Sequence, residues 1–384
     1  MGVNVSRNLR DMVFVTSPEG QYFSEEVHRA FRKVLEDKLA QYREMPVGRN
    51  LYGWTAAERA EETRSFLDSY DSFEPVVIDY KAFAATEIEP HILDSIRGRD
   101  AYIFHAFVDG EGRYEPYKTQ FILQLINFTS RFADAAKVTD VLPNYPWQRQ
   151  DYKEKGRVPL SAKVMARNIQ TDIQRLITMD LHSEQQQGFF DIIVDELYGM
   201  RLFVDYYNRN GSRNDIVVVA PDSGAVRRAR GLAKRLGMGD TDIVIVDKRR
   251  DYSMPNEVYV YNLVGEELVR GRRSIIIDDI IDTGGTILEA AKKVRAAGAI
   301  DVSVFAPHAI FSPKNGQPTE ERLYRSPDID KVVITDSIPP RSSYSQYQDK
   351  IKLLHSAPLF AEAIYEIQTG GSVSRILQES EPNK

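Results

Sequence analysis

The sequence contains no cysteine, and this absence excludes several kinds of chemistry. Disulfide bonds, thiolate metal sites and cysteine nucleophiles are all ruled out. Long apolar runs are missing as well: no stretch approaches the roughly 20 apolar residues that a helix needs to cross a bilayer, and residues 1–7 lack the apolar centre of a signal peptide. We therefore expect a cytoplasmic protein without a membrane partner.

The sequence has fewer basic than acidic residues. The 384 residues include 50 Lys and Arg against 56 Asp and Glu, a net charge of −6. A chain with net negative charge has no general attraction to nucleic acid, so we expect no nucleic-acid partner, although phosphate sites can still form locally. With 42% hydrophobic and 28% charged residues, the composition is typical of a globular protein, and the length is sufficient for two domains.

Aliphatic segments of strand length alternate with helix-forming segments along the chain. Strands are predicted at residues 12–16, 75–79, 101–104, 137–142, 175–179, 215–220, 242–246, 275–277, 301–305 and 331–335. Helices are predicted at residues 24–38, 56–70, 117–135, 161–170, 225–236, 288–297 and 357–367. This alternation is typical of an α/β fold with mostly parallel sheets flanked by helices. We expect one domain at residues 1–198, a second at residues 199–350, and a C-terminal helix and tail at residues 351–384 that pack back on the first domain.

The most informative stretch lies at residues 274–286. Residues 275–277 are isoleucines, which predict a short buried strand, and residues 288–297 are strong helix formers. Between them stand Asp278, Asp279, Asp282, Thr283, Gly284, Gly285 and Thr286. Backbone N–H groups and the positive end of the helix can hold a phosphate here, and the two glycines allow its close approach. Because the carboxylates suit sugar hydroxyls or a hydrated metal ion, the stretch predicts a pocket for a phosphorylated sugar rather than an ordinary turn with acidic caps.

Two polar segments follow the ends of predicted strands in the first half of the chain. Arg149 and Gln150 come after the strand that ends at residue 142, and Arg149 could clamp a phosphate or stack on a base. His182 follows the strand at residues 175–179 and could coordinate a metal ion. Taken singly, the first segment could equally be a solvated loop, and His182 an ordinary core or surface histidine. Open α/β sheets, however, bind ligands at the carboxyl ends of their strands.

Two more such segments lie in the second half. Asp222 follows the strand at residues 215–220 and could hold Mg²⁺ or simply cap the next helix. Lys248, Arg249 and Arg250 follow the strand at residues 242–246. Three adjacent cations suit the negative charge of a transferring phosphoryl or pyrophosphoryl group, although a solvated basic turn is the alternative. All four segments lie at strand ends in the chain that carries the sugar-phosphate motif, and this coincidence favours a shared site.

Together with the sugar-phosphate motif, these segments resemble the ribose-phosphate pyrophosphokinase (phosphoribosyl pyrophosphate synthetase) family. Further segments occur in the family's order: Pro159-Leu160-Ser161-Ala162-Lys163, Thr178-Met179-Asp180-Leu181-His182, Gln187-Gly188-Phe189-Phe190-Asp191, Val333-Ile334-Thr335-Asp336-Ser337-Ile338-Pro339 and Ala357-Pro358-Leu359-Phe360-Ala361. The resemblance is close from about Arg149 to Leu377 and traceable before that. It implies two phosphoribosyltransferase-like domains and assembly into dimers or hexamers.

By this resemblance, the chain would transfer the β,γ-pyrophosphoryl group of ATP to the C1 hydroxyl of ribose 5-phosphate, with Mg²⁺ as cofactor. The products would be phosphoribosyl pyrophosphate and AMP. The residues implied to bind ribose 5-phosphate are Asp278, Asp279, Asp282, Thr283, Gly284, Gly285 and Thr286. The other implied roles are ATP binding by Arg149 and Gln150, metal binding by His182 and Asp222, and transition-state stabilisation by Lys248 and Arg250 on a mobile loop.

The sequence departs from the family at the adenine-binding segment. The family's Phe-Ser-Asp-Gly-Glu stands here as Phe83-Ala84-Ala85-Thr86-Glu87, so a carboxylate is missing at Ala85. Phe83 can still stack on a base, and Glu87 can still accept a hydrogen bond. In the family this segment reaches the ATP of a neighbouring subunit, so the departure bears on nucleotide preference and on assembly.

The main interpretation has three alternatives, of which the first follows from a further departure from the family. Residues 43–74 resemble an insertion relative to the family. Because an insertion can change which acceptor binds, the first alternative is the same chemistry on a larger acceptor such as ADP-ribose. The second is a non-catalytic regulatory subunit, although such a protein would have little reason to keep the basic segment, His182, Asp222 and the acidic loop together. The third is a simple phosphoribosyltransferase, which would lack the second α/β half.

Overall fold

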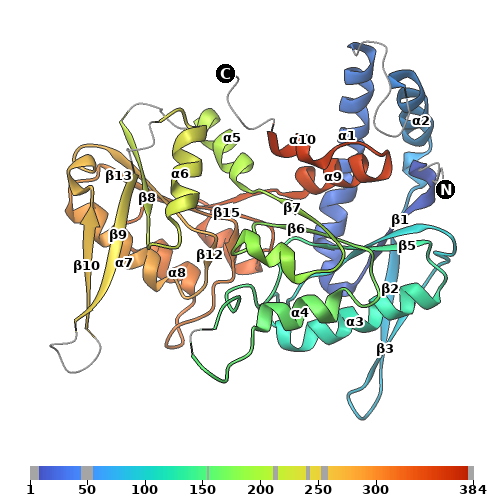
Figure 1. The fold of residues 1–384 in the computed structure, drawn as a ribbon, viewed down its shortest axis with the longest axis horizontal. Helices are drawn as coiled ribbons and strands as arrows, with labels where there is room; N and C mark the ends of the chain where they lie inside the picture. The colour runs from blue at the N-terminus through green and yellow to red at the C-terminus, as the bar shows by residue number, and fades with distance from the viewer. Residues whose placement is uncertain are drawn as a thin grey trace. The chain divides into compact units, whose positions relative to one another are not determined.

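The computed structural model describes residues 8–44, 55–153, 155–210, 215–238, 243–251 and 258–378 (Figure 1). Contacts within the chain divide it into two compact units. Unit 1 contains the described residues up to Leu197 together with His355–Gln378, and unit 2 contains Tyr198–Leu354. The chain therefore returns to unit 1 at its C-terminal end after completing unit 2.

Unit 1 is built on a seven-stranded sheet with the order β3-β2-β1-β4-β5-β6-β7. Its strands are β1 (Met12–Thr16), β2 (Val76–Ala82), β3 (Ile88–Ile92), β4 (Asp100–Phe104), β5 (Lys137–Leu142), β6 (Arg175–Met179) and β7 (Ile193–Leu197). All neighbours pair in parallel except the edge hairpin of β2 and β3. The central strands are buried along almost their whole length, as parallel strands covered on both faces must be.

Helices cover both faces of this sheet. They are α1 (Gln21–Glu44), α2 (Ala56–Asp68), α3 (Pro116–Phe132), α4 (Ser161–Ile169), α9 (Ala357–Gln368) and α10 (Val373–Gln378). On one face, Leu123 and Ile126 of α3 pack with Met165 of α4 in the core cluster that includes Val13 and Val15. On the other face, α1 packs against α2 and α9, and Phe14 contacts Phe31 edge-on at 5.7 Å between ring centroids.

Unit 2 repeats the design with a sheet of order β10-β9-β8-β11-β13-β15-β16. Its strands are β8 (Ile216–Ala220), β9 (Ile243–Asp251), β10 (Val258–Val264), β11 (Arg273–Ile277), β13 (Asp301–Ala306), β15 (Lys331–Thr335) and β16 (Ile351–Leu354), with a small separate pair of β12 (Ile280–Ile281) and β14 (His308–Ala309). Only the β9–β10 edge pair of the large sheet is antiparallel. Its helices are α5 (Met200–Asn210), α6 (Val226–Arg235), α7 (Gly285–Ala296) and α8 (Thr319–Arg325).

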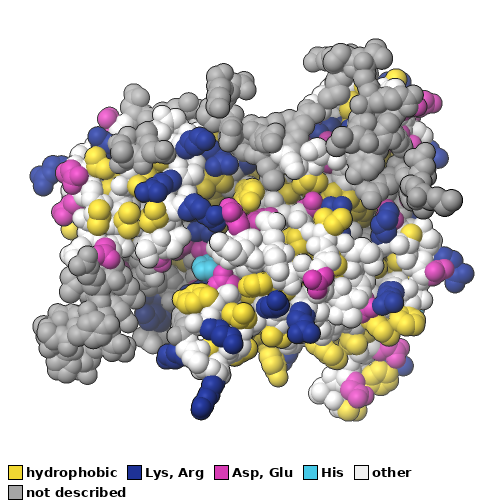
Figure 2. Space-filling model, viewed as in Figure 1, with side chains coloured by type: hydrophobic (Ala, Val, Ile, Leu, Met, Phe, Trp, Pro, Cys, Tyr) yellow, Lys and Arg dark blue, Asp and Glu magenta, His cyan; other side chains and the backbone are white. Residues whose placement is uncertain are grey.

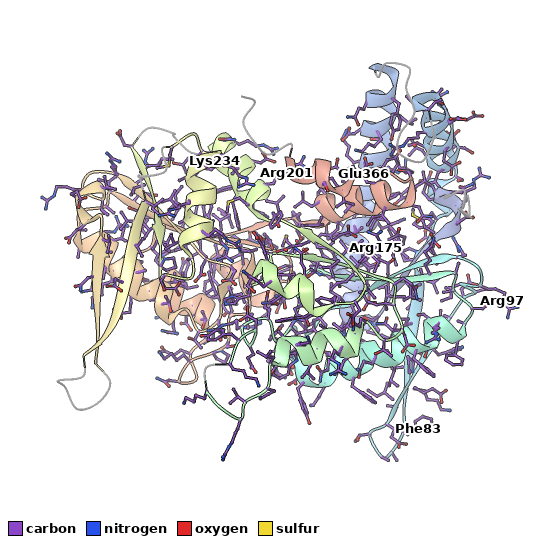
Figure 3. The ribbon with its side chains drawn as sticks, viewed as in Figure 1. Phe83, Arg97, Arg175, Arg201, Lys234 and Glu366 are labelled. Atoms are coloured by element: carbon purple, nitrogen blue, oxygen red, sulfur yellow. The ribbon has the colours of Figure 1, made fainter. Side chains whose placement is uncertain are left out.

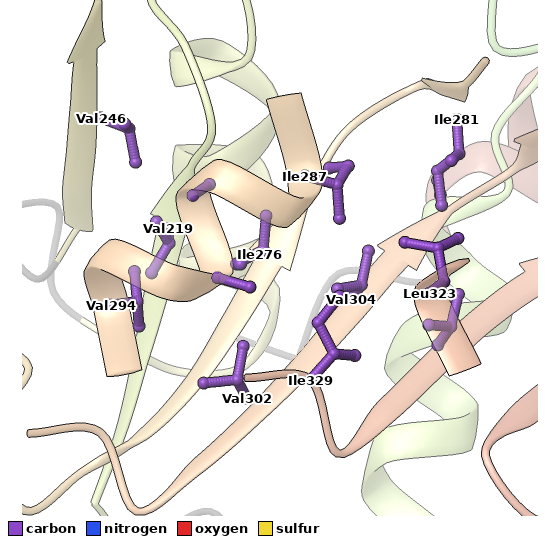
Figure 4. Packing of buried hydrophobic residues seen from close by; sticks show 14 of the residues in the cluster. Val219, Val246, Ile276, Ile281, Ile287, Val294, Val302, Val304, Leu323 and Ile329 are labelled. Carbon is purple, nitrogen blue, oxygen red and sulfur yellow. The ribbon is translucent and has the colours of Figure 1, made fainter. Parts of the chain in front are cut away.

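Alternate side chains of the central strands form the two cores of unit 2. Ile276 packs with Ile287 and Val294 of α7 on one face (Figure 4). The neighbouring Ile275 packs on the other face with Phe203 of α5 and residues of α6. Because successive strand residues point to opposite faces, the isoleucine run fills both cores and fixes where β11 ends. The residues that follow it must then leave the sheet at its carboxyl edge.

Six short 3₁₀ helices complete the described structure: η1 (Leu9–Asp11), η2 (Pro18–Gly20), η3 (Tyr70–Ser72), η4 (Glu184–Phe189), η5 (Glu266–Leu268) and η6 (Ser342–Tyr347). No helix in the described ranges has both the length and the apolarity needed to span a membrane.

Several predicted boundaries were wrong. The first helix was expected at residue 24 but α1 begins at Gln21, because Ser17 caps the preceding η2 by accepting the N–H of Gly20 at 3.1 Å. The strand expected to end at residue 246 continues to Asp251 as β9, because β10 pairs with it. The edge strands β3, β7, β10 and β16 were not predicted. The short pair β12 and β14 and the helices α5, α8 and α10 were not predicted either.

Candidate functional site

The predicted sugar-phosphate loop lies between β11 and α7 of unit 2. The backbone N–H of Asp278 donates to Phe305 O of β13 at 3.0 Å, which continues the sheet one residue past β11. Gly284 has a φ of 72° and precedes the first residue of α7, Gly285. Residues 283–286 thus surround the start of a helix whose first N–H groups have no partner within the helix. This arrangement suits a bound phosphate.

Helix α8 holds the loop in this conformation. Arg322 Nη1 donates to Thr283 O at 2.6 Å. A Cβ on Gly284 would lie 3.1 Å from Thr319 Cγ2, so a side chain there would be both crowded and strained by the positive φ. The sequence alone did not single out Thr319 or Arg322, because α8 is an ordinary polar helix whose role depends only on its position.

The acidic residues of the loop form a crowded group. Asp279 is 4% exposed, and its backbone N–H donates to Asp278 Oδ1 at 2.9 Å. Arg228 of α6 lies beside both carboxylates, with Nη1 3.8 Å from Asp278 Oδ1 and Nη2 3.7 Å from Asp279 Oδ2. Burial, followed by the like charge of Asp279, raises the pKa of Asp278 well above its ordinary value, and Arg228 offsets part of this effect. Arg228 is a further residue that sequence reasoning missed.

Asp222 belongs to the same group. It follows β8, and Asp222 Oδ1 accepts the N–H of Ala225 at 3.1 Å just before α6. Its negative charge also helps to raise the pKa of Asp278. The bond goes to the residue before α6 and not to an N–H inside the helix, so the structure does not show the helix-capping role that the sequence offered as one possibility. The charge effect on Asp278 places this carboxylate close to the sugar-phosphate loop.

Unit 1 brings together the segments that contain Arg149, Gln150 and His182. The N–H of His182 donates to Gln148 Oε1 at 2.9 Å. Ser183 Oγ donates to Asp151 Oδ2 at 2.6 Å. Hydrogen bonds from His182 and Ser183 thus tie their loop to the loop that contains Arg149 and Gln150, two exposed residues. These two predicted ligand segments lie side by side at the carboxyl edge of the unit 1 sheet.

The backbone of this edge is constrained. Trp147 has a φ of 62° and Asp180 a φ of 45°, values that non-glycine residues rarely adopt. Glu196 braces the loop before His182, because its Oε1 accepts the N–H of Leu181 at 2.9 Å. Burial raises the pKa of Glu196 to about 7. Strain of this kind persists only where the surrounding structure enforces it, and it concentrates at functional sites.

Phe83 and Glu87 lie elsewhere in unit 1, at the tip of the β2–β3 hairpin (Figure 3). The loop closes through Phe83 N, which donates to Glu87 O at 2.9 Å. The Phe83 ring is 41% exposed, and Lys81 Nζ lies 4.8 Å from its centroid. The hairpin tip thus presents an exposed aromatic ring with a cation beside it. The other candidate residues described in unit 1 lie on different loops.

The sequence suggested that Lys248 and Arg250 lie in a loop, but the structure places both in a strand. Their backbones belong to β9, where Lys248 pairs with Tyr261 and Arg250 with Tyr259 of β10. The positions of their side chains are outside what the structure describes. Within the described residues, no three His, Asp or Glu side chains form a typical metal-ion cluster.

Comparison with known proteins decides the family. The model for the N-terminal domain of ribose phosphate pyrophosphokinase matches residues 56–172, and the phosphoribosyl transferase domain model matches residues 196–336. A ribose-phosphate pyrophosphokinase of Clostridium acetobutylicum is 40% identical over 301 residues, which cover 77% of this chain and 88% of that protein. The chain belongs to the ribose-phosphate pyrophosphokinase family.

Other members of the ribose-phosphate pyrophosphokinase family agree. The protein of Hyphomonas neptunium is 38% identical over 299 residues, covering 78% of this chain and 90% of its own length. The crystal structure of phosphoribosylpyrophosphate synthetase from Mycobacterium smegmatis matches with a TM-score of 0.73 and 26% identity, covering 94% of this chain and all of that one. The family resemblance and the expected fold of two phosphoribosyltransferase-like domains are confirmed.

Proposed function

We propose that this chain is a cytoplasmic ribose-phosphate pyrophosphokinase, which transfers the β,γ-pyrophosphoryl group of ATP to the C1 hydroxyl of ribose 5-phosphate. The products are phosphoribosyl pyrophosphate and AMP. The observation that carries the proposal is the loop of residues 278–286, which places the half-buried Asp278 and the buried Asp279 beside a helix start with a positive-φ glycine. It occurs in a chain that is 40% identical to a ribose-phosphate pyrophosphokinase.

The acceptor is held by unit 2. The N–H groups of Thr283, Gly284, Gly285 and Thr286 bind the 5-phosphate, assisted by the positive end of α7. Asp278, Asp279 and Asp282 accept hydrogen bonds from the ribose hydroxyls, and Arg228 keeps the first two in place. The raised pKa of Asp278 supports this role, because donors from a bound sugar would stabilise its ionised form.

The donor is held by residues of unit 1. Arg149 and Gln150 contact ATP, and the exposed ring of Phe83 stacks on a base, with Glu87 accepting a hydrogen bond from it. The exposure of Phe83 at a hairpin tip supports a role in binding ATP on a neighbouring copy. The missing carboxylate at Ala85 would loosen selection among purine nucleotides rather than abolish binding.

Mg²⁺ is the proposed cofactor. It prefers oxygen ligands, keeps several waters and usually takes only one or two protein carboxylates together with substrate phosphates. Asp222 fits this requirement, because its charge and that of Asp278 repel each other and a cation would relieve the repulsion. His182 is the other proposed ligand, by the family resemblance alone. When bound, Mg²⁺ would neutralise the charge of the ATP phosphates.

Lys248 and Arg250 stabilise the charge that develops on the transferring group, while the sugar hydroxyl itself is the nucleophile. Since such stabilisation acts mainly in the transition state, Lys248→Ala is expected to lower kcat far more than it raises the KM for ATP. Lys292→Ala, a change at an exposed position on α7, is the control. Near-normal turnover in Lys248→Ala would reject this role.

We also propose that unit 1 is the first phosphoribosyltransferase-like domain and that unit 2 is the second. Copies of the chain assemble into a dimer or hexamer.

The aromatic side chains of α3 support assembly. Tyr117, Phe121, Phe128 and Phe132 are 73, 61, 50 and 72% exposed, and their spacing of four or seven residues places them on one helix face. Figure 2 shows hydrophobic side chains gathered along the region of α3 and α4. Such patches mark interaction sites.

Light scattering tests the assembly. Phe121→Ser with Phe128→Ser should lower the molar mass to that of a smaller species, while Lys118→Ser on the same helix should not. An unchanged mass in the double variant would exclude this face as an interface.

The activity is tested by incubating the protein with ATP and Mg²⁺ and offering ribose 5-phosphate or ADP-ribose separately. The proposal predicts AMP release with ribose 5-phosphate. Release only with ADP-ribose would reassign the acceptor, and no AMP with either would reject the proposed activity.

A further inference from the structure

Lys314 lies on a rigid turn beside the sugar-phosphate loop. The backbones of Lys314 and Gln317 exchange both hydrogen bonds at 3.0 Å. Between them, Asn315 has a φ of 53° and Gly316 a φ of 77°. Two consecutive positive φ values in an Asn-Gly pair define a type I′ turn, the tightest kind of two-residue hairpin. The backbone of Lys314 is therefore fixed although the residue is exposed.

The side chain of Lys314 points toward the start of α7. Its Nζ lies 3.8 Å from the position that a Cβ on Gly285 would occupy. Within the part of the chain that the structure describes, Lys314 forms no ion pair or side-chain hydrogen bond. An ammonium group thus lies at the phosphate loop with its donors unused.

The loop otherwise has little positive charge available for a phosphate. The start of a helix is equivalent to roughly half an elementary charge. Arg322 already donates to Thr283 O at 2.6 Å, and Arg228 lies beside Asp278 and Asp279. Among the described residues, Lys314 is the cation whose charged group lies within 4 Å of the Cβ position of Gly285, so it is the group placed to respond to the charge of a bound phosphate.

We propose that Lys314 is a specificity-determining residue that binds the terminal phosphate of the acceptor and favours a doubly charged phosphomonoester. The proposal rests on the proposed function and narrows its substrate class. A cation attracts a dianion about twice as strongly as a monoanion at the same distance. Ribose 5-phosphate ends in such a dianion. In ADP-ribose the same phosphate is joined to a second phosphate through an anhydride bond and carries one charge, so Lys314 disfavours that larger acceptor.

Lys314→Met tests the proposal, with Lys292→Met on the exposed side of α7 as the matched control. Calorimetry with Mg²⁺ and α,β-methylene ATP measures binding without turnover. The ligands are ribose 5-phosphate and ribose 5-sulfate, which has the same shape but a single charge. Lys314→Met should weaken ribose 5-phosphate roughly tenfold or more and ribose 5-sulfate clearly less, so the preference for the dianion shrinks. Lys314→Arg should restore most of it, and Lys292→Met should match the wild type.

Several outcomes separate this inference from the proposed function. Equal weakening of both ligands by Lys314→Met, or no weakening of either, would overturn the role of Lys314 while the wild type still binds ribose 5-phosphate and releases AMP. Failure of Lys314→Arg to recover the preference would also overturn it. Failure of the wild-type protein to bind ribose 5-phosphate would instead overturn the proposed function, and this inference with it.

Discussion

Lys38 Nζ of α1 lies 2.7 Å from Glu366 Oε1 of α9, although the two residues are 328 positions apart in the chain. Lys38 is 8% and Glu366 7% exposed, so the pair is largely removed from water. Arg59 of α2 contacts the second oxygen of Glu366 at 3.3 Å (Glu366 is labelled in Figure 3). The same carboxylate thus joins three helices and fixes the C-terminal helix to unit 1.

Lys38→Met should destabilise unit 1 strongly. Removing one partner of a buried ion pair typically costs about 3–5 kcal/mol, and Arg59 remains beside Glu366, so we expect the lower end of this range. Urea denaturation should therefore show a free energy of unfolding lower by about 3 kcal/mol. Lys33→Met, at an exposed pair with Asp37 on the same helix, should leave the free energy of unfolding nearly unchanged, because exposed ion pairs contribute little.

The double change Lys38→Met and Glu366→Gln provides the internal test. It removes the charges of Lys38 and Glu366 together, while Arg59 keeps its hydrogen bond to Thr369 Oγ1 at 2.7 Å. The double change should therefore recover part of the stability lost in the single variant. A double variant that is less stable than Lys38→Met would show that the ion pair is not what holds α9.

The buried Asp140 should make the stability of the protein depend on pH. The residue is fully buried in unit 1, where Asp140 Oδ2 accepts from Asn127 Nδ2 at 2.9 Å, and burial raises its pKa to about 8. The folded protein keeps this proton, whereas the unfolded chain releases it near pH 4. The contribution of Asp140 to the free energy of unfolding is therefore favourable at low pH. It is lost as pH rises from about 4 to 8, at up to roughly 1.4 kcal/mol per pH unit.

Asp140→Asn removes this titration. The difference in free energy of unfolding between wild type and variant, measured in urea from pH 5 to 9, should shift steadily in favour of the variant and level off near pH 8. A difference that does not change with pH would mean that Asp140 is ionised throughout.

Arg228→Met should change the pH dependence of acceptor use. Arg228 lowers the raised pKa of Asp278, so without it the carboxylate ionises only at higher pH. The acid limb of the kcat/KM profile for ribose 5-phosphate is expected to move to higher pH, with partial recovery of activity in alkaline buffer. Arg230→Met, an exposed change on the same helix, should leave the limb in place, and an unshifted limb in Arg228→Met would argue against the charge coupling.

Gly284→Ala should impair acceptor binding specifically. An alanine there adopts an unfavourable φ of 72° and lies 3.1 Å from Thr319 Cγ2, so the loop must move. Gly271→Ala has a comparable φ of 73° but open space around it. Both variants should lose about 1 kcal/mol of stability, but only Gly284→Ala should raise the KM for ribose 5-phosphate. Equal KM values in the two variants would contradict the phosphate-binding role of the loop.

The sequence predicted those parts of the fold and site that consecutive residues encode. The isoleucine run, the Thr-Gly-Gly-Thr turn and the helix formers after it specify β11, the loop and α7 without reference to the rest of the chain. The central parallel strands were found for the same reason, because burial on both faces requires unbroken apolar runs.

The missed features depend on contacts between distant segments. Arg228, Arg322 and Lys314 lie on ordinary polar elements, and only folding brings them to the loop. The strands β3 and β10 lie at sheet edges, and in β3 half-exposed residues alternate with exposed ones, which gives a weak signal. The extension of β9 through Lys248 and Arg250 follows from its pairing with β10, whereas the basic residues themselves suggested a loop.

The central claim is that the protein transfers an intact pyrophosphoryl group to a sugar phosphate. The most direct measurement is a ³¹P NMR time course of ATP, Mg²⁺ and ribose 5-phosphate with the wild-type protein. The account predicts that AMP and the diphosphate resonances of phosphoribosyl pyrophosphate rise together in equal amounts. Formation of ADP in place of AMP, or AMP accompanied by free pyrophosphate without the sugar product, would contradict it.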